Sequence, residues 1–199
     1  MDNIAKTIYI NLDRRTDRRA EMEAELTKIG MTAERFPAIE RKPGALGCGL
    51  SQLAVLRRAK EEGWENILIL EDDFTFLVDR ATFDQELKSI FDLKIPYDVI
   101  MLSYGSTIST PFNSVLSRVR TAQTASGYIV NSRFYDTLIH TWNNATINLE
   151  ATGDEHKWAI DQAWKPLQPT AEWFCFNRRI GKQRPGFSDN VGAFVSYNC

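Results

Sequence analysis

The chain lacks the cysteine pattern of a disulfide framework or of a zinc site. It contains three cysteines, Cys48, Cys175 and Cys199, which lie far apart and form no Cys-x-x-Cys pair. Small disulfide-stabilised domains carry an even and dense set of cysteines, and structural zinc sites need closely spaced ligands. A reducing compartment is therefore the expected environment, and we expect a cytoplasmic protein.

Long apolar runs and an excess of charge are also missing. No stretch approaches the roughly 20 apolar residues of a membrane span, and residues 1–6 show no signal peptide, so we expect no transmembrane segment. The 24 basic and 26 acidic residues nearly balance, which argues against nucleic-acid binding because that needs a basic field. Without repeats or a low-complexity tract, the 199 residues fit one domain, 1–199.

The most informative stretch is a short apolar run followed by three acids. Residues 67–70 read Ile-Leu-Ile-Leu, which is typical of a strand buried on both faces, and Glu71, Asp72 and Asp73 follow it. Burying acids at a strand end costs desolvation energy unless a cation compensates them. If the strand continued, Glu71 and Asp73 would share one face and Asp72 would take the other.

Two hard oxygen ligands on one face suit Mg²⁺ or Mn²⁺ carrying a substrate phosphate. The sequence therefore predicts a metal site at Glu71 and Asp73. An acidic loop that only solubilises the edge of a sheet is the alternative interpretation.

The rest of the chain alternates between strand-like and helix-like patterns, which predicts an α/β sandwich around a mostly parallel sheet. We expect a nucleotide-binding half over about 1–105 and an acceptor-side half over about 106–199. The predicted strands are 7–12, 32–39, 67–70, 97–104, 124–130 and 172–177. Helices are predicted from a Thr16 cap to Ile29, over 50–60, after an Asp79 cap, after a Ser132 cap and from 153 to 164.

Four arginines follow the first strand, at 14, 15, 18 and 19. An arginine near a helix N-terminus opposes the helix dipole unless an anion lies there. A solvated basic turn balanced by Asp13 and Asp17 is the alternative. The glycine-rich segment 42–49 is predicted to be a loop whose backbone N–H groups could meet a phosphate or hydroxyl. Residues 106–119 are predicted to be a flexible connection, and the cationic tail 178–190 either covers an anionic substrate or is disordered.

Taken together, these segments resemble glycosyltransferase family 25, which includes bacterial lipopolysaccharide galactosyltransferases and collagen hydroxylysine galactosyltransferase domains. The resemblance spans nearly the whole chain, although each motif alone is weak. The motifs are Ile10-Asn11-Leu12-Asp13-Arg14, Arg35-Phe36-Pro37-Ala38, Gly47-Cys48-Gly49-Leu50-Ser51-Gln52, Leu68 to Asp73, Tyr97-Asp98-Val99-Ile100, Ala125 to Val130, and Gln183 with Phe187-Ser188-Asp189. One departure is Gln52, because the family usually has Leu-Ser-His there, and glutamine cannot carry a proton as histidine can.

The resemblance implies a GT-A fold that binds a nucleotide sugar and an inverting transfer from a UDP-sugar, usually UDP-galactose, to a saccharide or hydroxylated acceptor. It places Glu71, Asp72 and Asp73 at the Asp-x-Asp position, where Mn²⁺ or Mg²⁺ bridges the donor diphosphate. A metal and nearby cations would stabilise the charge that develops on departing UDP. The implied donor-binding residues are Asn11, Leu12, Arg14, Arg18, Ser51, Gln52, Asp72, Lys182, Gln183 and Arg184.

An inverting transfer also needs a base for the acceptor hydroxyl. Asp161 is the candidate, because it precedes Trp164 as the family's downstream acid does, and Asp154 and Glu155 are its rivals. Two other functions remain open. Gln52 would suit a non-catalytic module that binds a nucleotide sugar, and a nucleotidyltransferase would share the fold and the metal.

Overall fold

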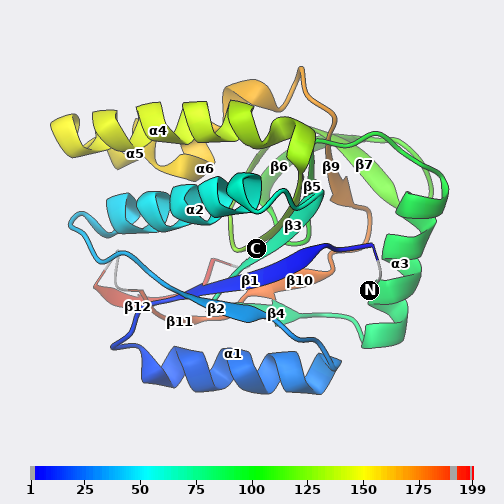
Figure 1. Ribbon diagram of the computed structural model, residues 1–199, viewed down its shortest axis with the longest axis horizontal. Coiled ribbons are helices and arrows are strands. Elements are labelled where there is room, and N and C mark those ends of the chain that lie inside the picture. Colours follow the sequence, from blue (N-terminus) through cyan, green and yellow to red (C-terminus); the bar gives the residue numbers. More distant parts are fainter. Residues whose placement is uncertain (1–2, 189–191, 198) are drawn as a thin grey trace.

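Eight strands form the central sheet in the computed structural model of the chain, which describes residues 3–188, 192–197 and 199 (Figure 1). Two of them, β8 (Gly127–Asn131) and β7 (Leu116–Gln123), run in the direction opposite to the other six strands. The sheet is therefore mostly parallel, and the predicted α/β fold is confirmed. In spatial order the strands are β2 (Glu34–Pro37), β1 (Lys6–Asn11), β3 (Asn66–Glu71), β8 (Gly127–Asn131), β5 (Val99–Met101), β9 (Trp173–Phe176), β7 (Leu116–Gln123) and β6 (Gly105–Pro111).

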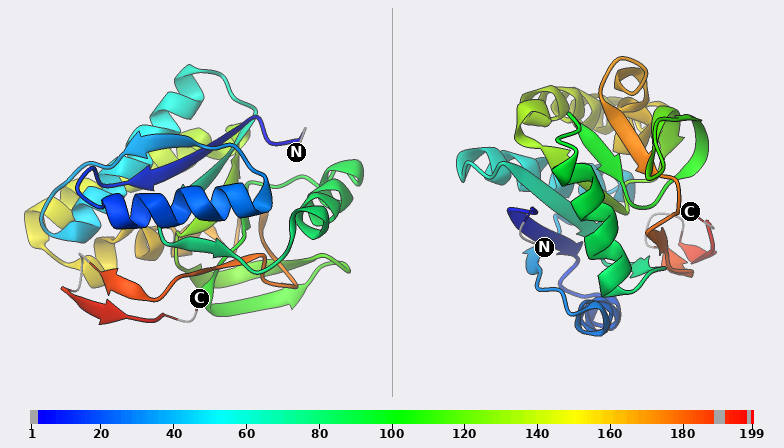
Figure 2. Two further views of the ribbon diagram at one scale, coloured as in Figure 1. Left: turned by 90° about the horizontal axis from the view of Figure 1, so that it is seen from below. Right: turned by 90° about the vertical axis from the view of Figure 1, so that its right-hand side faces the viewer.

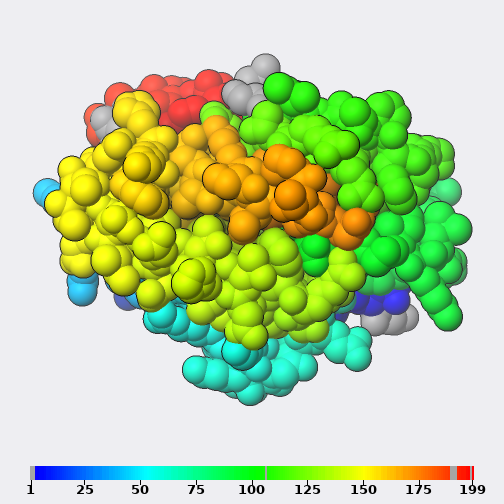
Figure 3. All heavy atoms as spheres, turned by 90° about the horizontal axis from the view of Figure 1, so that it is seen from above, coloured from blue at the N-terminus to red at the C-terminus, as the bar shows by residue number. Residues whose placement is uncertain are grey.

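Helices cover both faces of the sheet, because the central strands are apolar on both sides. Ile67 and Ile69 pack with α2 (Gly44–Glu61) and α4 (Tyr135–Thr152), whereas Leu68 and Leu70 pack with α1 (Thr16–Ile29) and α3 (Arg80–Asp92). Figure 2 shows α1 lying across the strands on its face, and Figure 3 shows α4 and the segments after it covering the other. The helices are α1 (Thr16–Ile29), α2 (Gly44–Glu61), α3 (Arg80–Asp92), α4 (Tyr135–Thr152), α5 (Glu155–Trp158) and α6 (Ile160–Ala163), with 3₁₀ turns η1 (Ser132–Phe134) and η2 (Lys165–Leu167).

The prediction of a loop over 42–49 is wrong, since α2 begins at Gly44. The glycines there allow close packing instead of loop flexibility. A Cβ atom on Gly47 would lie 2.5 Å from the backbone oxygen of Ile39, and one on Gly49 would lie 3.0 Å from side-chain atoms of Ile160 and Thr146. Glycine at these two positions thus lets α2 approach the neighbouring segments more closely than a residue with a Cβ atom would allow.

Helix boundaries follow the predictions in part. Asp79 caps α3 through a bond from the Thr82 backbone N–H (2.8 Å), as predicted, and Gly30 ends α1 in the left-handed conformation. Thr16 is not a cap, because α1 begins with it and no side chain caps that end. Ser132 is not a cap either, since the Asn131 side chain accepts the Arg133 N–H and a 3₁₀ turn precedes α4.

Two connections also differ from the predictions. Residues 106–119 are not a flexible connection but most of the β6–β7 hairpin at the edge of the sheet, whose strands pair antiparallel. The single helix expected over 153–164 is two short helices, α5 and α6, because the backbone is extended at Ala159 (φ −56°, ψ 143°).

The tail of the chain is ordered where it meets the acidic segment. β10 (Gly181–Gln183) pairs antiparallel with β4 (Phe74–Phe76), and β11 (Gly186–Ser188) pairs with β12 (Ala193–Val195). The Phe74 ring is fully buried between two glycines of different strands, Gly127 and Gly181. Asp189, which belongs to one of the family-like motifs, lies outside the described residues.

Gly181→Ala should destabilise the fold and loosen the tail. A Cβ atom at 181 would lie 2.0 Å from the Phe74 ring carbon Cζ, and overpacking of this kind costs about 1–3 kcal/mol. Thermal melting measures the loss. The control is Gly186→Ala, where the atom nearest to the new Cβ would lie at 3.9 Å, and it should melt near the wild-type temperature. Gly153→Ala would not serve as a control, because Gly153 has a positive φ.

Candidate functional site

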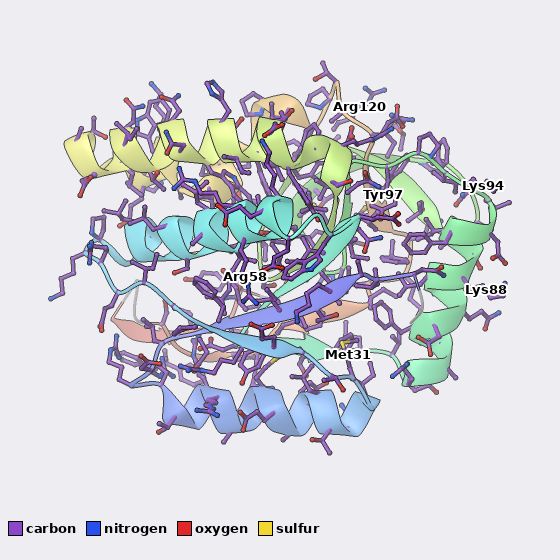
Figure 4. All side chains as sticks on the ribbon, in the orientation of Figure 1. Met31, Arg58, Lys88, Lys94, Tyr97 and Arg120 are labelled. Carbon is purple, nitrogen blue, oxygen red and sulfur yellow. The ribbon has the colours of Figure 1, made fainter. Side chains whose placement is uncertain are left out.

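A pocket opens at the carboxyl ends of β1 and β3, where ligands bind in open α/β sheets. It brings together nine of the residues that the sequence predicted for the site. These are Asn11, Leu12, Arg14, Arg18, Ser51, Glu71, Asp72, Asp73 and Gln183. In Figure 4 the labelled Lys88 and Lys94 lie at the right, on and just after α3, and Arg120 lies at the top, and none of the three lines the pocket.

Arg18 joins two of the three acids. Its Nη1 atom lies 2.9 Å from Asp72 Oδ1 and 3.0 Å from Asp73 Oδ2. Asn11 Nδ2 donates to the second oxygen of Asp72 at 2.7 Å, and Arg35 in turn donates to Asn11 Oδ1 at 3.0 Å. Asp72 therefore has a donor on each oxygen and is held in place by the first strand.

The expected alternation of Glu71 and Asp73 is wrong, because the strand ends at Glu71 and a turn follows. Asp72 and Asp73 share the Arg18 guanidinium, whereas Glu71 bonds elsewhere. Glu71 Oε1 accepts from Gln52 Nε2 at 3.0 Å and from Cys48 Sγ at 3.3 Å. The helix α2, which carries both donors, thus holds Glu71, and α1 holds the aspartates.

Two carboxylate oxygens of the acidic segment accept no hydrogen bond from the described residues, and they belong to Glu71 and Asp73. Asp73 Oδ1 is buried without a partner, while its Oδ2 accepts from Arg18 and from Gln183 Nε2. Glu71 Oε2 has no donor within the described chain, and Glu71 lines the pocket. Desolvation by burial raises the pKa of Glu71 to about 8, and burial also raises the pKa of Asp73 despite Arg18. These two oxygens without a donor are hard ligands of the kind that Mg²⁺ and Mn²⁺ prefer.

Without a divalent cation, stability should fall as pH rises from about 5 to about 9. The pKa of Glu71 is about 8 in the folded state, and its ordinary value is 4.5. Between these two pKa values the folded state binds more protons than the unfolded state, so the free energy of unfolding decreases as pH rises. Melting curves in EDTA across this range check the slope, and Glu71→Gln, which cannot titrate, should flatten it. An unchanged slope in Glu71→Gln would assign the effect to other groups.

The tail closes one side of the pocket through several contacts. The Phe187 carbonyl accepts from Arg18 Nη2 at 2.9 Å and from Arg15 Nη1 at 3.2 Å. The Arg184 backbone N–H bonds to the Asp73 carbonyl at 2.6 Å, and Ser188 lines the pocket. This arrangement agrees with the interpretation that the tail covers the site.

Four predicted residues lie outside the pocket lining. Gln52 is buried behind Glu71, and Lys182 neighbours Gln183 on β10, where successive side chains point to opposite faces. Arg184 pairs with Glu21 at 2.7 Å. Asp161 accepts the Thr124 backbone N–H at 3.2 Å and Gln162 Nε2 at 3.3 Å.

The rival acids of Asp161 lie at the start of α5. Asp154 is exposed, and its carboxylate caps α5 by accepting the Lys157 N–H at 3.2 Å. Glu155 lies in the first turn of the same helix. Asp161 is half-buried, and its charge adds to the rise in the pKa of the Cys48 thiol, which burial dominates.

Several residues of the pocket were not predicted from the sequence. Ile39, Glu40 and Arg41 line it from the segment before α2. Nothing in their spacing marks a site, because the segment becomes part of the pocket only when β2 pairs with β1. Arg35, which holds Asn11, was visible within the Arg-Phe-Pro-Ala motif but had no assigned role.

No family model matches the chain. A protein named Glycosyltransferase 25 family member from Anopheles gambiae is 28% identical over 37% of this chain and 17% of its own length. One of the same name from Drosophila pseudoobscura pseudoobscura is 30% identical over 34% of this chain and 15% of its own. The chain thus matches less than a fifth of the length of these curated relatives.

A solved structure shares the fold along almost the whole chain. It is the crystal structure of a glycosyltransferase involved in the glycosylation of the major capsid of PBCV-1, with a TM-score of 0.57, 10% identity, and coverage of 94% of this chain and 96% of that one. None of the described helices is long and apolar enough to cross a membrane. The resemblance to glycosyltransferase family 25 is confirmed by the two relatives, and the α/β fold is one that a glycosyltransferase adopts.

Proposed function

We propose that the chain transfers a hexose from a UDP-sugar to a hydroxyl group of a saccharide or other hydroxylated acceptor, with Mn²⁺ or Mg²⁺. The observation that carries the proposal is the pair of carboxylate oxygens, Glu71 Oε2 and Asp73 Oδ1, that accept no hydrogen bond from the described residues, on two residues that line a pocket at the carboxyl ends of β1 and β3. UDP as the nucleotide, galactose as the sugar and inversion at its anomeric carbon come from the family resemblance.

Positive charge near the pocket suits the diphosphate of such a donor. Arg14, Arg41 and Lys42 line the pocket beside Gly44, the first residue of α2. The first turn of α2 contains no acid, and no side chain caps it, so its N–H groups and the positive end of its dipole favour an anion. The donor phosphates can therefore lie between this end of α2 and the acidic segment.

Glu71 Oε2 and Asp73 Oδ1 are the protein atoms that would hold the cation. No group of three or more His, Cys, Asp or Glu side chains in the described parts of the chain could hold a metal by itself. Mg²⁺ and Mn²⁺ at nucleotide sites often take one or two carboxylates and complete their coordination with phosphate oxygens and water. When bound, the cation supplies positive charge that stabilises the departing UDP.

Asp161 remains the proposed base for the acceptor hydroxyl. Its side chain is half-buried, and the hydrogen bond that it accepts from the Thr124 backbone N–H fixes its position. Arg18, Asn11 and Gln183 would orient the donor side by holding the aspartates and the tail. This division places the donor beside α1 and the acceptor beside α6.

The purified protein should release UDP from a UDP-hexose in the presence of Mn²⁺. A panel of UDP-sugars, offered with saccharide and hydroxylysine-peptide acceptors and followed by mass spectrometry, should give one preferred donor and a glycosylated product. Binding of UDP-sugar without any release would instead indicate a non-catalytic binding module. Cleavage of a nucleoside triphosphate with release of pyrophosphate would indicate a nucleotidyltransferase. Either of these results would overturn the proposed function.

A further inference from the structure

Glu71 is held from one side only. Its Oε1 atom accepts two hydrogen bonds, from Gln52 Nε2 at 3.0 Å and from Cys48 Sγ at 3.3 Å. Its Oε2 atom accepts none from the described residues, and the residue lines the pocket. A carboxylate fixed through one oxygen presents the other in a fixed direction. The donors on Oε1 therefore decide where Oε2 lies.

Gln52 is itself fixed by Tyr128. The Gln52 side chain is fully buried, and its Oε1 atom accepts the Tyr128 hydroxyl. The Tyr128 ring is also fully buried and packs edge-on against Trp164 and Trp142, with ring centroids 5.4 Å and 6.2 Å away. Because rigid aromatic rings surround the tyrosine, the hydroxyl has little freedom to move away from the amide.

The polarity of the amide makes this arrangement specific. A glutamine side chain has one acceptor oxygen and one donor nitrogen, and it does not change charge with pH. With the oxygen bonded to Tyr128, the NH₂ group must face Glu71. A flipped amide would set its oxygen against the Glu71 carboxylate and leave the Tyr128 hydroxyl without an acceptor, which is costly in a buried site.

We propose that Gln52, oriented by Tyr128, is a positioning residue that aims Glu71 Oε2 at the divalent cation. This inference rests on the proposed function, because it assumes the cation site described above. It also gives a physical role to the departure from the family pattern at position 52, since glutamine here is a pH-independent hydrogen-bond donor to Glu71. Groups that orient metal ligands typically change metal affinity by about 10–100-fold when removed.

The test is Mn²⁺ binding without any sugar donor, measured by the electron paramagnetic resonance signal of free Mn²⁺. Gln52→Met keeps the shape and removes the hydrogen bonds of the amide, including those with Glu71 and Tyr128, so its Kd for Mn²⁺ should rise about 10–100-fold. Tyr128→Phe removes only the hydroxyl and should raise the Kd by a smaller factor. Because Tyr128 acts through Gln52, the double variant should bind Mn²⁺ no more weakly than Gln52→Met alone.

Tyr135→Phe is the matched control, because the Tyr135 hydroxyl is also buried but has no hydrogen-bond partner. It should leave the Kd for Mn²⁺ unchanged. Melting temperatures separate the roles, since a merely structural Gln52 would lower the melting temperature without changing Mn²⁺ affinity. Wild-type Kd in Gln52→Met, or additive losses in the double variant, would overturn this inference alone. Absence of Mn²⁺ binding in the wild type, both alone and with saturating UDP, would overturn it together with the metal-dependent function.

Discussion

EDTA should abolish sugar transfer, and added Mn²⁺ should restore it. Asp73→Asn keeps the shape of the side chain and removes its charge, so donor binding and turnover should fall together, turnover by roughly 10²–10³-fold. That range corresponds to the several kcal/mol of charge stabilisation that a catalytic cation supplies. The variant should still melt near the wild-type temperature, because burial already disfavours the ionised form of Asp73.

Asp136→Asn is the matched control for this result. Asp136 lies on α4, and its side chain is 76% exposed and paired with Lys60. The same chemical change there should leave transfer and donor affinity unchanged. Full activity in EDTA would show that the metal assignment is wrong and would leave Arg18, which contacts both aspartates, as the principal positive charge of the acidic segment.

Asp161→Asn should cut turnover by roughly 10²–10⁴-fold, the usual contribution of a positioned base. The affinity for the UDP-sugar should stay nearly unchanged, since the base acts on the acceptor. The substitution suits the test because an asparagine oxygen can still accept the Thr124 N–H, so the local backbone should persist. Isothermal calorimetry for the donor and steady-state rates for transfer give the two quantities.

Asp154→Asn is the matched control, because asparagine caps a helix about as well as aspartate does. It should turn over at the wild-type rate. If Asp161→Asn also turns over normally, another group is the base. If Asp161→Asn loses donor binding as severely as Asp73→Asn, it belongs to the donor side. Either outcome would refute the base assignment and leave the transferase proposal intact.

The buried strand and its acids could be predicted because the signal is local. Residues 67–70 are apolar in sequence, and a run of that kind with acids at its end is typical of a buried strand that leads into a polar site. The place of Asn11 at the site followed from general topology, since parallel strands bring their carboxyl ends to one edge, although its hydrogen bond with Asp72 was not predicted.

Other parts of the site depend on contacts between distant segments. The helical state of Gly47 and Gly49 is set by backbone and side chains that surround them, which overrides their low helix propensity. The turn that brings Asp72 and Asp73 to Arg18 begins where β3 ends. The ends of strands are hard to predict from sequence, so the alternation of these acids was predicted wrongly. The β10 strand exists only through its pairing with β4, so its short sequence carries little signal.

The pairing of β10 with β4 has a consequence for the order in which the molecule assembles. Gly181 pairs with Phe76, about a hundred residues earlier in the chain, whereas Ile8 pairs with Glu34 close by. Closing the longer loop costs more chain entropy, and contacts between distant residues tend to form late. We therefore expect the sheet around β1 and β3 to form before Gln183 reaches Asp73. The sheet would then be folded before the molecule can bind a ligand, because the last segment to dock completes the pocket.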